Sequence, residues 1–185
     1  QVCQPSNAAQ YFHLLRRQMR DARCIPLVVL TPKSMLRHPR AMSGLNQLAQ
    51  GSFEPVIDDP HVEERSTVGK VLLCSGKVYY DLMLEQERRK ASDFAIVRLE
   101  QLYPYPGDIV ERTLKSYPNA RQIRWVQEEP RNMGAWNFLH QRLAEISPSD
   151  RGLKYIGRPE SASPATGSLR AHRQEQGALT NAAFD

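Results

Sequence analysis

The sequence lacks the signals that mark several large classes of protein. Its three cysteines are Cys3, Cys24 and Cys74, and no two of them form the Cys-x-x-Cys pair of zinc knuckles and dithiol redox sites. No apolar run approaches the ~18 residues of a membrane-spanning helix, and the first residues do not resemble a signal peptide. We therefore expect reduced thiols and no membrane partner, in a bacterial cytoplasm or, in a eukaryote, the mitochondrial matrix.

Patterns of catalytic residues are equally scarce. The five histidines are dispersed, and none forms a His-x-x-x-His pair, so no metal site is predicted. Ser161, Ser163 and Ser168 lack the Gly-x-Ser-x-Gly context of a nucleophilic serine. The chain opens on Gln1, which favours a piece of a longer protein. These observations leave no predicted catalytic residue and no predicted metal ligand.

The positive charge is concentrated near the N-terminus. Residues 1–40 hold seven basic residues and one acid, for a net charge of +6, whereas the remaining residues hold 18 basic and 19 acidic ones, for −1. No aromatic residues alternate with the arginines as stacking platforms for nucleic acid, so we expect no nucleic-acid partner. The segment is either plain solvated surface or a groove for an anion such as a coenzyme phosphate. The predicted anion donors are Arg16, Arg17, Lys33 and Arg37.

The first third of the chain predicts a small unit followed by a linker. Residues 1–36 are interpreted as strand, helix and strand, with Ser6 as the helix cap and the apolar run 26–31 as the second strand. Such a unit is too small to close a core, so we expect it to dock on other sheet, on the rest of the chain or on another copy. Residues 37–69 are rich in proline and glycine and predict a linker, with one helical turn near 45–49.

Residues 70–185 have a regular rhythm of apolar runs and helical patterns. This alternation predicts an α/β fold with three layers, in which a mainly parallel sheet carries helices on both faces. The predicted strands are 71–74, 94–97, 123–126 and 153–156, and the predicted helices are 78–90, a segment capped by Asp108, a segment from Trp136 and a segment from Ser168 towards Phe184.

The loop after the first of these strands, Ser75-Gly76-Lys77, has to be weighed as a phosphate loop. Such a loop needs a glycine five residues before Gly76, but the sequence has Val71 there. A tight turn in which Ser75 caps the next helix is therefore the favoured interpretation. An anion at the helix start beside Lys77 stays open as the alternative.

Two further groups of residues are candidates for interface or structural roles. Glu128 and Glu129 follow a buried run at an expected strand-to-helix turn, ahead of Trp136. Adjacent residues of a strand point to opposite sides, so the pair is not expected to share a substrate, and a structural or ion-pair role is favoured over acid–base catalysis. Tyr103 and Tyr105 alternate with prolines in a stiff loop, which either packs on its own domain or contacts another protein.

Four stretches of the sequence are distinctive in their wording: Cys74–Asp81, Arg98–Pro104, Gln127–Trp136 and Gly157–Pro159. Together they resemble one family, 2-oxoglutarate dehydrogenase, the thiamine-dependent first component of the 2-oxoglutarate dehydrogenase complex. The resemblance covers the whole chain and corresponds to the C-terminal portion of the family. It implies that residues 1–36 end a pyrimidine-binding domain and that 70–185 form a C-terminal domain like that of transketolases.

The resemblance also implies a reaction, cofactors and partners. The family decarboxylates 2-oxoglutarate in the citric acid cycle and passes the succinyl group to lipoamide of dihydrolipoyl succinyltransferase. Thiamine diphosphate and Mg²⁺ lie between domains of the two subunits of a homodimer. The Gly-Asp-Gly motif that holds them is missing from this chain, and the family's cofactor glutamate and active-site histidines belong to upstream segments. No catalytic or cofactor-binding residue is therefore carried over.

What remains for this segment is assembly and effector binding. Some relatives are activated by acetyl-CoA and some bind AMP near this part of the molecule. A regulatory nucleotide- or CoA-binding module, a purely structural interaction domain and the same region of a 2-oxoadipate dehydrogenase stay open as alternatives. The matched motifs give the predicted interface or structural residues, which are Ser75, Gly76, Lys77, Tyr103, Tyr105, Glu128, Glu129 and Trp136.

Overall fold

The computed structural model describes residues 1–147 and 152–185. Its strands are β1 (Val2–Cys3), β2 (Val28–Val29), β3 (Val56–Ile57), β4 (Lys70–Cys74), β5 (Phe94–Leu99), β6 (Gln101–Tyr103), β7 (Gln122–Pro130) and β8 (Gly152–Arg158). Its α-helices are α1 (Ala8–Arg20), α2 (Leu45–Ala49), α3 (Val78–Arg89), α4 (Gly107–Lys115), α5 (Trp136–Ile146) and α6 (Leu169–Phe184). Three short 3-10 helices are η1 (Lys33–Arg37), η2 (Pro39–Ala41) and η3 (Arg65–Thr67).

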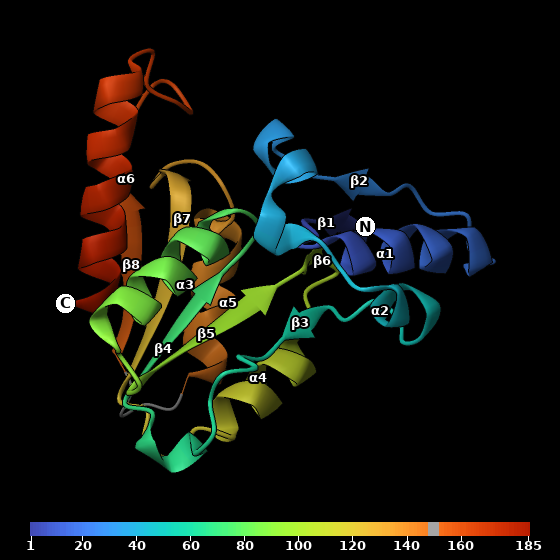
Figure 1. Ribbon diagram of the computed structural model, residues 1–185, viewed down its shortest axis with the longest axis horizontal. Helices are drawn as coiled ribbons and strands as arrows, with labels where there is room; N and C mark the ends of the chain where they lie inside the picture. The colour runs from blue at the N-terminus through green and yellow to red at the C-terminus, as the bar shows by residue number, and fades with distance from the viewer. Residues whose placement is uncertain (148–151) are drawn as a thin grey trace.

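A five-stranded sheet forms the centre of the larger part of the molecule, on the left of Figure 1. Its strand order is β3-β5-β4-β7-β8; the last four strands are parallel and β3 runs antiparallel to β5. Val71 to Cys74 in β4 are all fully buried, as expected for a strand covered on both faces. The predicted mainly parallel sheet is confirmed.

Helices cover both faces of this sheet. α3 and α6 bury Leu82 and Phe184 against one face, and α4 and α5 bury Leu114 and Leu139 against the other. The side chains of β4 alternate between the two cores, because successive residues of a strand point to opposite faces. The predicted three-layer α/β architecture is therefore confirmed. In the two described ranges, no helix is long and apolar enough to cross a bilayer.

The N-terminal residues form a second, smaller sheet, at the right of Figure 1. β1 pairs parallel with β2 and antiparallel with β6. β6 begins only two residues after β5 ends, so the chain passes from the large sheet directly into the small one. The small sheet, α1, η1, η2 and α2 are called the N-terminal layer below.

Several sequence-based boundaries differ from the structure. The run 26–31 forms a strand only at Val28–Val29. The cap of α1 is Asn7, whose side chain accepts from the Gln10 N–H at 2.9 Å, rather than Ser6. Ser6 cannot serve because its polar groups are all engaged elsewhere, as described below. α4 begins at Gly107, ahead of Asp108, so the predicted Asp108 cap is wrong.

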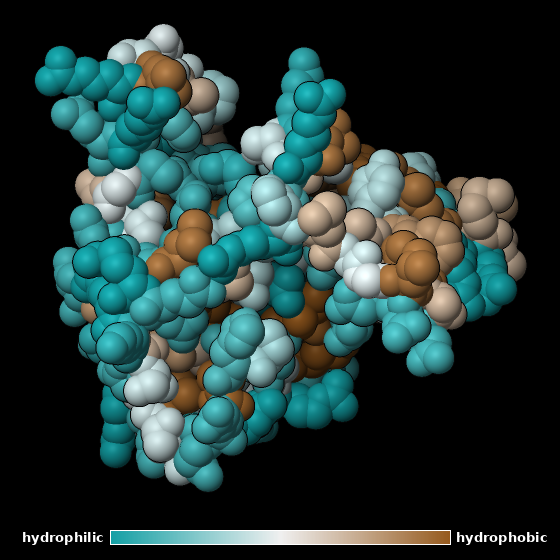
Figure 2. Space-filling view, in the orientation of Figure 1, coloured by the Kyte–Doolittle hydropathy of each residue, from teal (hydrophilic) through white to brown (hydrophobic). Residues whose placement is uncertain are grey.

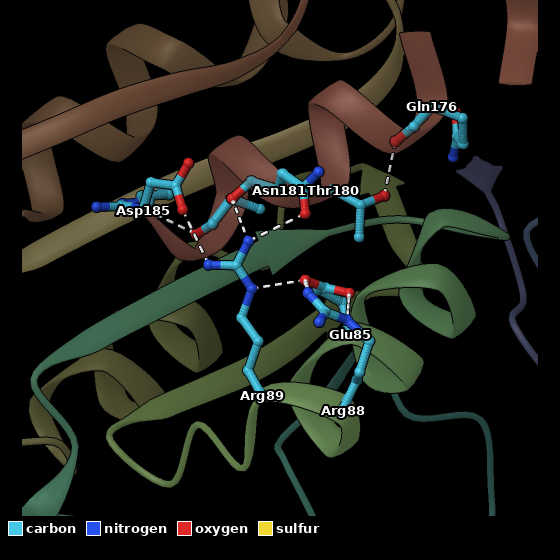
Figure 3. Close-up of polar contacts among 9 residues, drawn as sticks. Glu85, Arg88, Arg89, Gln176, Thr180, Asn181 and Asp185 are labelled. Carbon is cyan, nitrogen blue, oxygen red and sulfur yellow. Dashed lines mark hydrogen bonds and ion pairs between the residues drawn. The ribbon is translucent and has the colours of Figure 1, made fainter. Parts of the chain in front are cut away.

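Arg89 links α3 to the end of the last helix, α6, through hydrogen bonds (Figure 3). From the end of α3 its guanidinium reaches Asp185 Oδ1 at 2.9 Å and Asn181 Oδ1 at 3.0 Å, at the end of α6. It also donates to Glu85 Oε1 one turn earlier in α3. The neighbouring Arg88 bonds only with Glu85 among the contacts drawn, and so stays within α3.

Candidate functional site at the switch point of the sheet

The candidate site lies at the carboxyl ends of β4 and β7. These neighbouring parallel strands continue in opposite directions: β4 leads through α3 to β5, and β7 leads through α5 to β8. The divergence leaves a crevice at the strand ends, the topological switch point where open α/β sheets bind ligands. Two of the sequence motifs, Ser75-Gly76-Lys77 and Glu128-Glu129, meet there.

Lys77 and Glu128 form an ion pair across the switch point. Lys77 Nζ lies 2.7 Å from Glu128 Oε1 and 3.6 Å from Asp81 Oδ2. Burial alone would lower the pKa of Lys77, but the hydrogen bond and charge of Glu128, together with Asp81, raise it above its ordinary value. The lysine is therefore held as a cation, and its charge is already matched by protein carboxylates. The sequence did not predict this pairing.

Glu129 belongs to a different environment from Glu128. Both residues are the last but two and last but one of β7, so they sit on the strand itself and not in the turn that the sequence predicted. The Glu128 side chain forms the ion pair with Lys77. The Glu129 side chain lines a cavity of about 430 Å³ together with Trp125 and Gln127. The expected divergence of the two carboxylates is what the strand geometry produces.

A buried glutamine fixes the loop between β7 and α5. Gln127 Oε1 accepts from the Trp125 indole N–H at 2.8 Å and from the Trp136 backbone N–H at 3.0 Å, and its Nε2 donates to the Met133 carbonyl at 2.8 Å. Gly134 adopts φ +67°, and a Cβ there would come within 2.9 Å of Gln127 Nε2. Sequence reasoning missed Gln127; the available signal was a polar residue directly continuing an apolar strand.

Gly76 lets the N-terminal layer approach the switch point. It adopts φ +70°, in the left-handed region that favours glycine, and a Cβ at this position would overlap the side-chain amide of Gln4. Ser75 donates its hydroxyl proton to the Leu99 carbonyl at 2.8 Å. The prediction that Ser75 caps the following helix is therefore wrong, and α3 starts with Lys77 at its N-cap and no side-chain cap.

Ser6 joins the two parts of the molecule through all of its polar groups. Its N–H donates to Glu100 Oε2 at 2.7 Å, its hydroxyl accepts from Arg98 at 2.9 Å and its carbonyl accepts from the Tyr80 hydroxyl at 2.7 Å. Ser6 and Glu100 are fully buried. These four residues are called the Ser6 junction. The junction explains the Arg98–Pro104 stretch, because its first and third residues anchor the N-terminal layer.

The aromatic candidates have separate surroundings. Tyr103 is 57% exposed, and its ring lies edge-on to Phe138 at 6.2 Å. Tyr105 packs against the core, and burial raises its pKa to about 12. Trp136 is half-buried with its ring 5.2 Å from that of Tyr155. Tyr103 is thus the one of the three that presents its ring to the surroundings.

The predicted anion donors are divided between separate places. Arg16 and Arg17 line a cavity of about 610 Å³ with Arg20 and Arg23. Arg17 is partly engaged, because it donates to Gln1 Oε1 at 2.6 Å and stacks 4.3 Å from the Phe53 ring centroid. Lys33 lines a different cavity, next to the start of α1. Arg37 is exposed on η1 and lines neither of these two cavities.

The described residues do not fit a Mg²⁺ diphosphate site. Within 1–147 and 152–185, no group of three or more His, Cys, Asp or Glu side chains could hold a metal ion. At the switch point Glu128 is engaged by Lys77, which leaves a single carboxylate, and one carboxylate does not make the oxygen-rich shell that Mg²⁺ requires. No chemical step through thiamine diphosphate follows from these residues.

Comparison with known proteins identifies the family of the chain. Residues 42–184 match the family model described as 2-oxoglutarate dehydrogenase C-terminal. The 2-oxoglutarate dehydrogenase E1 components of Cupriavidus necator and Haemophilus influenzae are 52% and 43% identical to the whole chain. The chain spans only 19% and 20% of the lengths of those two relatives.

A solved structure shares the fold at low sequence identity. It is described as a split gene transketolase in an inactive beta4 tetramer, with a TM-score of 0.64 and 14% identity, over 100% of this chain and 57% of the other. This likeness confirms the expected transketolase-like fold. The family model and the curated relatives go further: the chain belongs to the 2-oxoglutarate dehydrogenase family and corresponds to its C-terminal region.

Proposed function

We propose that this chain is the C-terminal part of an E1 component that decarboxylates 2-oxoglutarate and transfers the succinyl group to lipoamide of dihydrolipoyl succinyltransferase. The names and identities of the relatives support this assignment. Thiamine diphosphate and Mg²⁺ belong outside this segment, because the described residues do not fit them. The related 2-oxoadipate activity is the alternative substrate choice. A bacterial cytoplasm is the proposed location, since the relatives named above are bacterial.

The role of the segment itself is assembly. Residues 1–36 act as the end of a pyrimidine-binding domain, 37–69 as the linker and 70–185 as the C-terminal domain. The observation that carries this proposal is the outer surface of the N-terminal layer, where α1 and β2 present large apolar side chains although the inner face of α1 is already buried. Figure 2 shows brown side chains gathered over this layer. The exposed residues of the surface, called the α1 outer face, are Tyr11, Phe12, Leu15, Met19 and Val28.

Exposed large apolar side chains grouped on one layer are typical of a protein–protein contact in an assembled enzyme. β2 adds an unpaired strand edge to it, because β2 has a sheet partner on one side only. The Ser6 junction holds this layer rigidly on the C-terminal domain. The segment thus serves as a rigid connector that presents the α1 outer face to the second subunit of a homodimer.

The experiment compares variants of the full-length enzyme by sedimentation velocity and steady-state turnover of 2-oxoglutarate. Phe12→Ser combined with Leu15→Ser should shift the enzyme towards free subunits, and the activity should fall in proportion to the dissociated fraction. Leu169→Ser changes an exposed leucine at the start of α6 and should leave the assembly intact. A double variant that stays fully assembled, or that loses turnover without dissociating, would contradict the assembly role.

A second role, binding of an anionic effector such as AMP or acetyl-CoA, is favoured by one observation. The cavity beside the C-terminal half of α1 gathers Arg16, Arg17, Arg20 and Arg23, with one acid, Asp21, among its lining residues. Guanidinium groups bind phosphates through paired hydrogen bonds. The segment would then act as the regulatory part of the enzyme.

Calorimetric titration of the full-length enzyme tests the effector role. Arg16→Ala combined with Arg20→Ala should weaken binding of AMP or acetyl-CoA by at least about tenfold. Lys33→Ala is the matched control, because Lys33 lines the other cavity, and it should leave the affinity unchanged. Equal loss in both variants, or no loss in the double variant, would rule out this cavity as the effector site.

A further inference from the structure

The cavity lined by Glu129 lies between the two parts of the molecule. One wall comes from β7 and the start of α5, with Trp125 and Phe138, and the opposite wall comes from the small sheet, with Leu30 and Leu102. Its volume of about 430 Å³ falls in the range of small-molecule sites, which are mostly apolar with a few convergent polar groups. It also sits at the switch point, where α/β sheets of this kind bind their ligands.

Glu129 is the only charged residue among those that line this cavity. Within the part of the chain that the structure describes, no hydrogen bond or ion pair engages its carboxylate; its backbone carbonyl alone accepts bonds, from Tyr155 and Gln127. The neighbouring Glu128, by contrast, is neutralised by Lys77 at 2.7 Å. A carboxylate at an apolar wall gains most from a cationic partner that brings its own apolar body into the cavity.

Two further observations indicate what kind of ligand the cavity would accept. Phe138 and Trp125 contribute aromatic side chains to the lining, and aromatic rings favour planar or cationic groups laid against them. One such cation, the Arg142 guanidinium, lies 3.9 Å from the centroid of the Phe138 ring. Gln4 contributes a side-chain amide, packed over Gly76, for which no hydrogen-bond partner is recorded among the described residues. The site therefore combines one negative charge, one neutral amide and aromatic walls.

We infer that this cavity binds a small cationic ligand with a flat apolar body, whose amidinium or ammonium group pairs with Glu129. The partner is a free small molecule. The side chain of an arginine from another protein carries the same cationic chemistry, and the experiment below separates the two sources.

The test uses benzamidine and benzoate as matched probes on the full-length protein, followed by ligand-observed saturation-transfer nuclear magnetic resonance. The two probes have nearly the same shape and opposite charge. Benzamidine should bind and benzoate should not. Glu129→Gln should weaken benzamidine binding by at least about tenfold, because the amidinium cation then meets a neutral amide in place of a carboxylate. Glu128→Gln should leave benzamidine binding unchanged, because this carboxylate faces Lys77.

A second variant keeps the inference testable if Glu129→Gln disturbs the fold. Leu30→Trp enlarges a side chain that is 41% exposed on the small sheet, so it should fill the cavity without straining the core and should abolish benzamidine binding. Equal binding of the two probes, or benzamidine binding that survives both Glu129→Gln and Leu30→Trp, would overturn the inference. Absence of benzamidine binding to the folded full-length protein, as expected if a protein side chain already occupies the cavity, would overturn it as well.

Discussion

At the scale of single residues, the molecule depends on a few buried polar groups that are engaged from several sides. Ser6 is the clearest case, because its N–H, hydroxyl and carbonyl each bond to a different residue of the C-terminal domain. Burial of such groups is tolerated only when they are hydrogen-bonded. The same rule makes their removal costly, since the partner is then left unsatisfied.

Ser6→Ala is predicted to lower the free energy of unfolding by about 1–3 kcal/mol. The substitution keeps the backbone bonds to Glu100 and Tyr80 but leaves the Arg98 guanidinium without its hydroxyl acceptor. Urea unfolding followed by circular dichroism measures the change. Ser52→Ala, at an exposed serine, is the control and should be neutral. Equal stability of the two variants would show that the hydroxyl bond contributes nothing.

The raised pKa of Glu100 leads us to expect that the stability of the fold falls as the pH rises. Burial raises its pKa above the ordinary value of 4.5, and Arg98 opposes this shift. The folded chain therefore holds the proton more tightly than the unfolded chain does. Its contribution to stability is present below pH 4.5 and is lost as the pH rises through the raised pKa.

Glu100→Gln cannot ionise, so the decline of stability above pH 4.5 should be smaller in this variant than in the parent chain. Urea unfolding at pH values from about 4 to about 8 measures the slope. Glu63→Gln changes an exposed glutamate and should keep the parental slope. An unchanged slope in Glu100→Gln would mean that Glu100 titrates alike in the folded and unfolded chain.

The sequence indicated which residues belong to the candidate site better than it indicated which residues they contact. Adjacent positions on a strand were enough to predict that Glu128 and Glu129 diverge, because the side-chain period of a strand is two. The pairing of Glu128 with Lys77 joins residues 51 positions apart and depends on which strands become neighbours in the sheet. Local patterns carry no information about which strands become neighbours, and the three hydrogen bonds of Ser6 could not be predicted for the same reason.

At the scale of elements, the apolar runs in residues 70–185 predicted strands correctly, whereas two short strands had no such run. The runs at 71–74, 94–97 and 123–126 became β4, β5 and β7. β3 and β6 have only two and three residues, too few for any periodic signal. They are strands because a neighbouring edge, β5 or β1, pairs with them, so tertiary contacts create them and local preference does not.

The packing of α6 on α3 can be tested with variants of two neighbouring arginines, one of which contacts α6. Arg89→Ala removes the bonds to Asp185 and Asn181 and should loosen the end of α6 from α3. Amide hydrogen exchange of residues 179–184 should then become several-fold faster. Arg88→Ala removes a contact within α3 only and should leave that exchange unchanged. Equal exchange in the two variants would show that apolar burial of Leu179 and Phe184 alone holds the helix.

At the scale of the whole molecule, the N-terminal layer and the C-terminal domain differ in what they bury. The C-terminal domain closes two cores around its sheet, whereas the core of the N-terminal layer is formed by Cys3, Leu14 and Phe53. The side chains of the α1 outer face stay exposed. The sequence predicted this deficit, because a strand-helix-strand unit has too little surface to bury; which side chains stay exposed required the structure.

We propose that this segment connects and positions domains and leaves the thiamine chemistry to the rest of the enzyme. Calorimetric titration of the isolated chain with thiamine diphosphate, in the presence and absence of Mg²⁺, is the decisive measurement. We expect no saturable heat in either condition, because no described cluster of side chains can hold the metal that neutralises the diphosphate. Saturable binding that requires Mg²⁺ would contradict it.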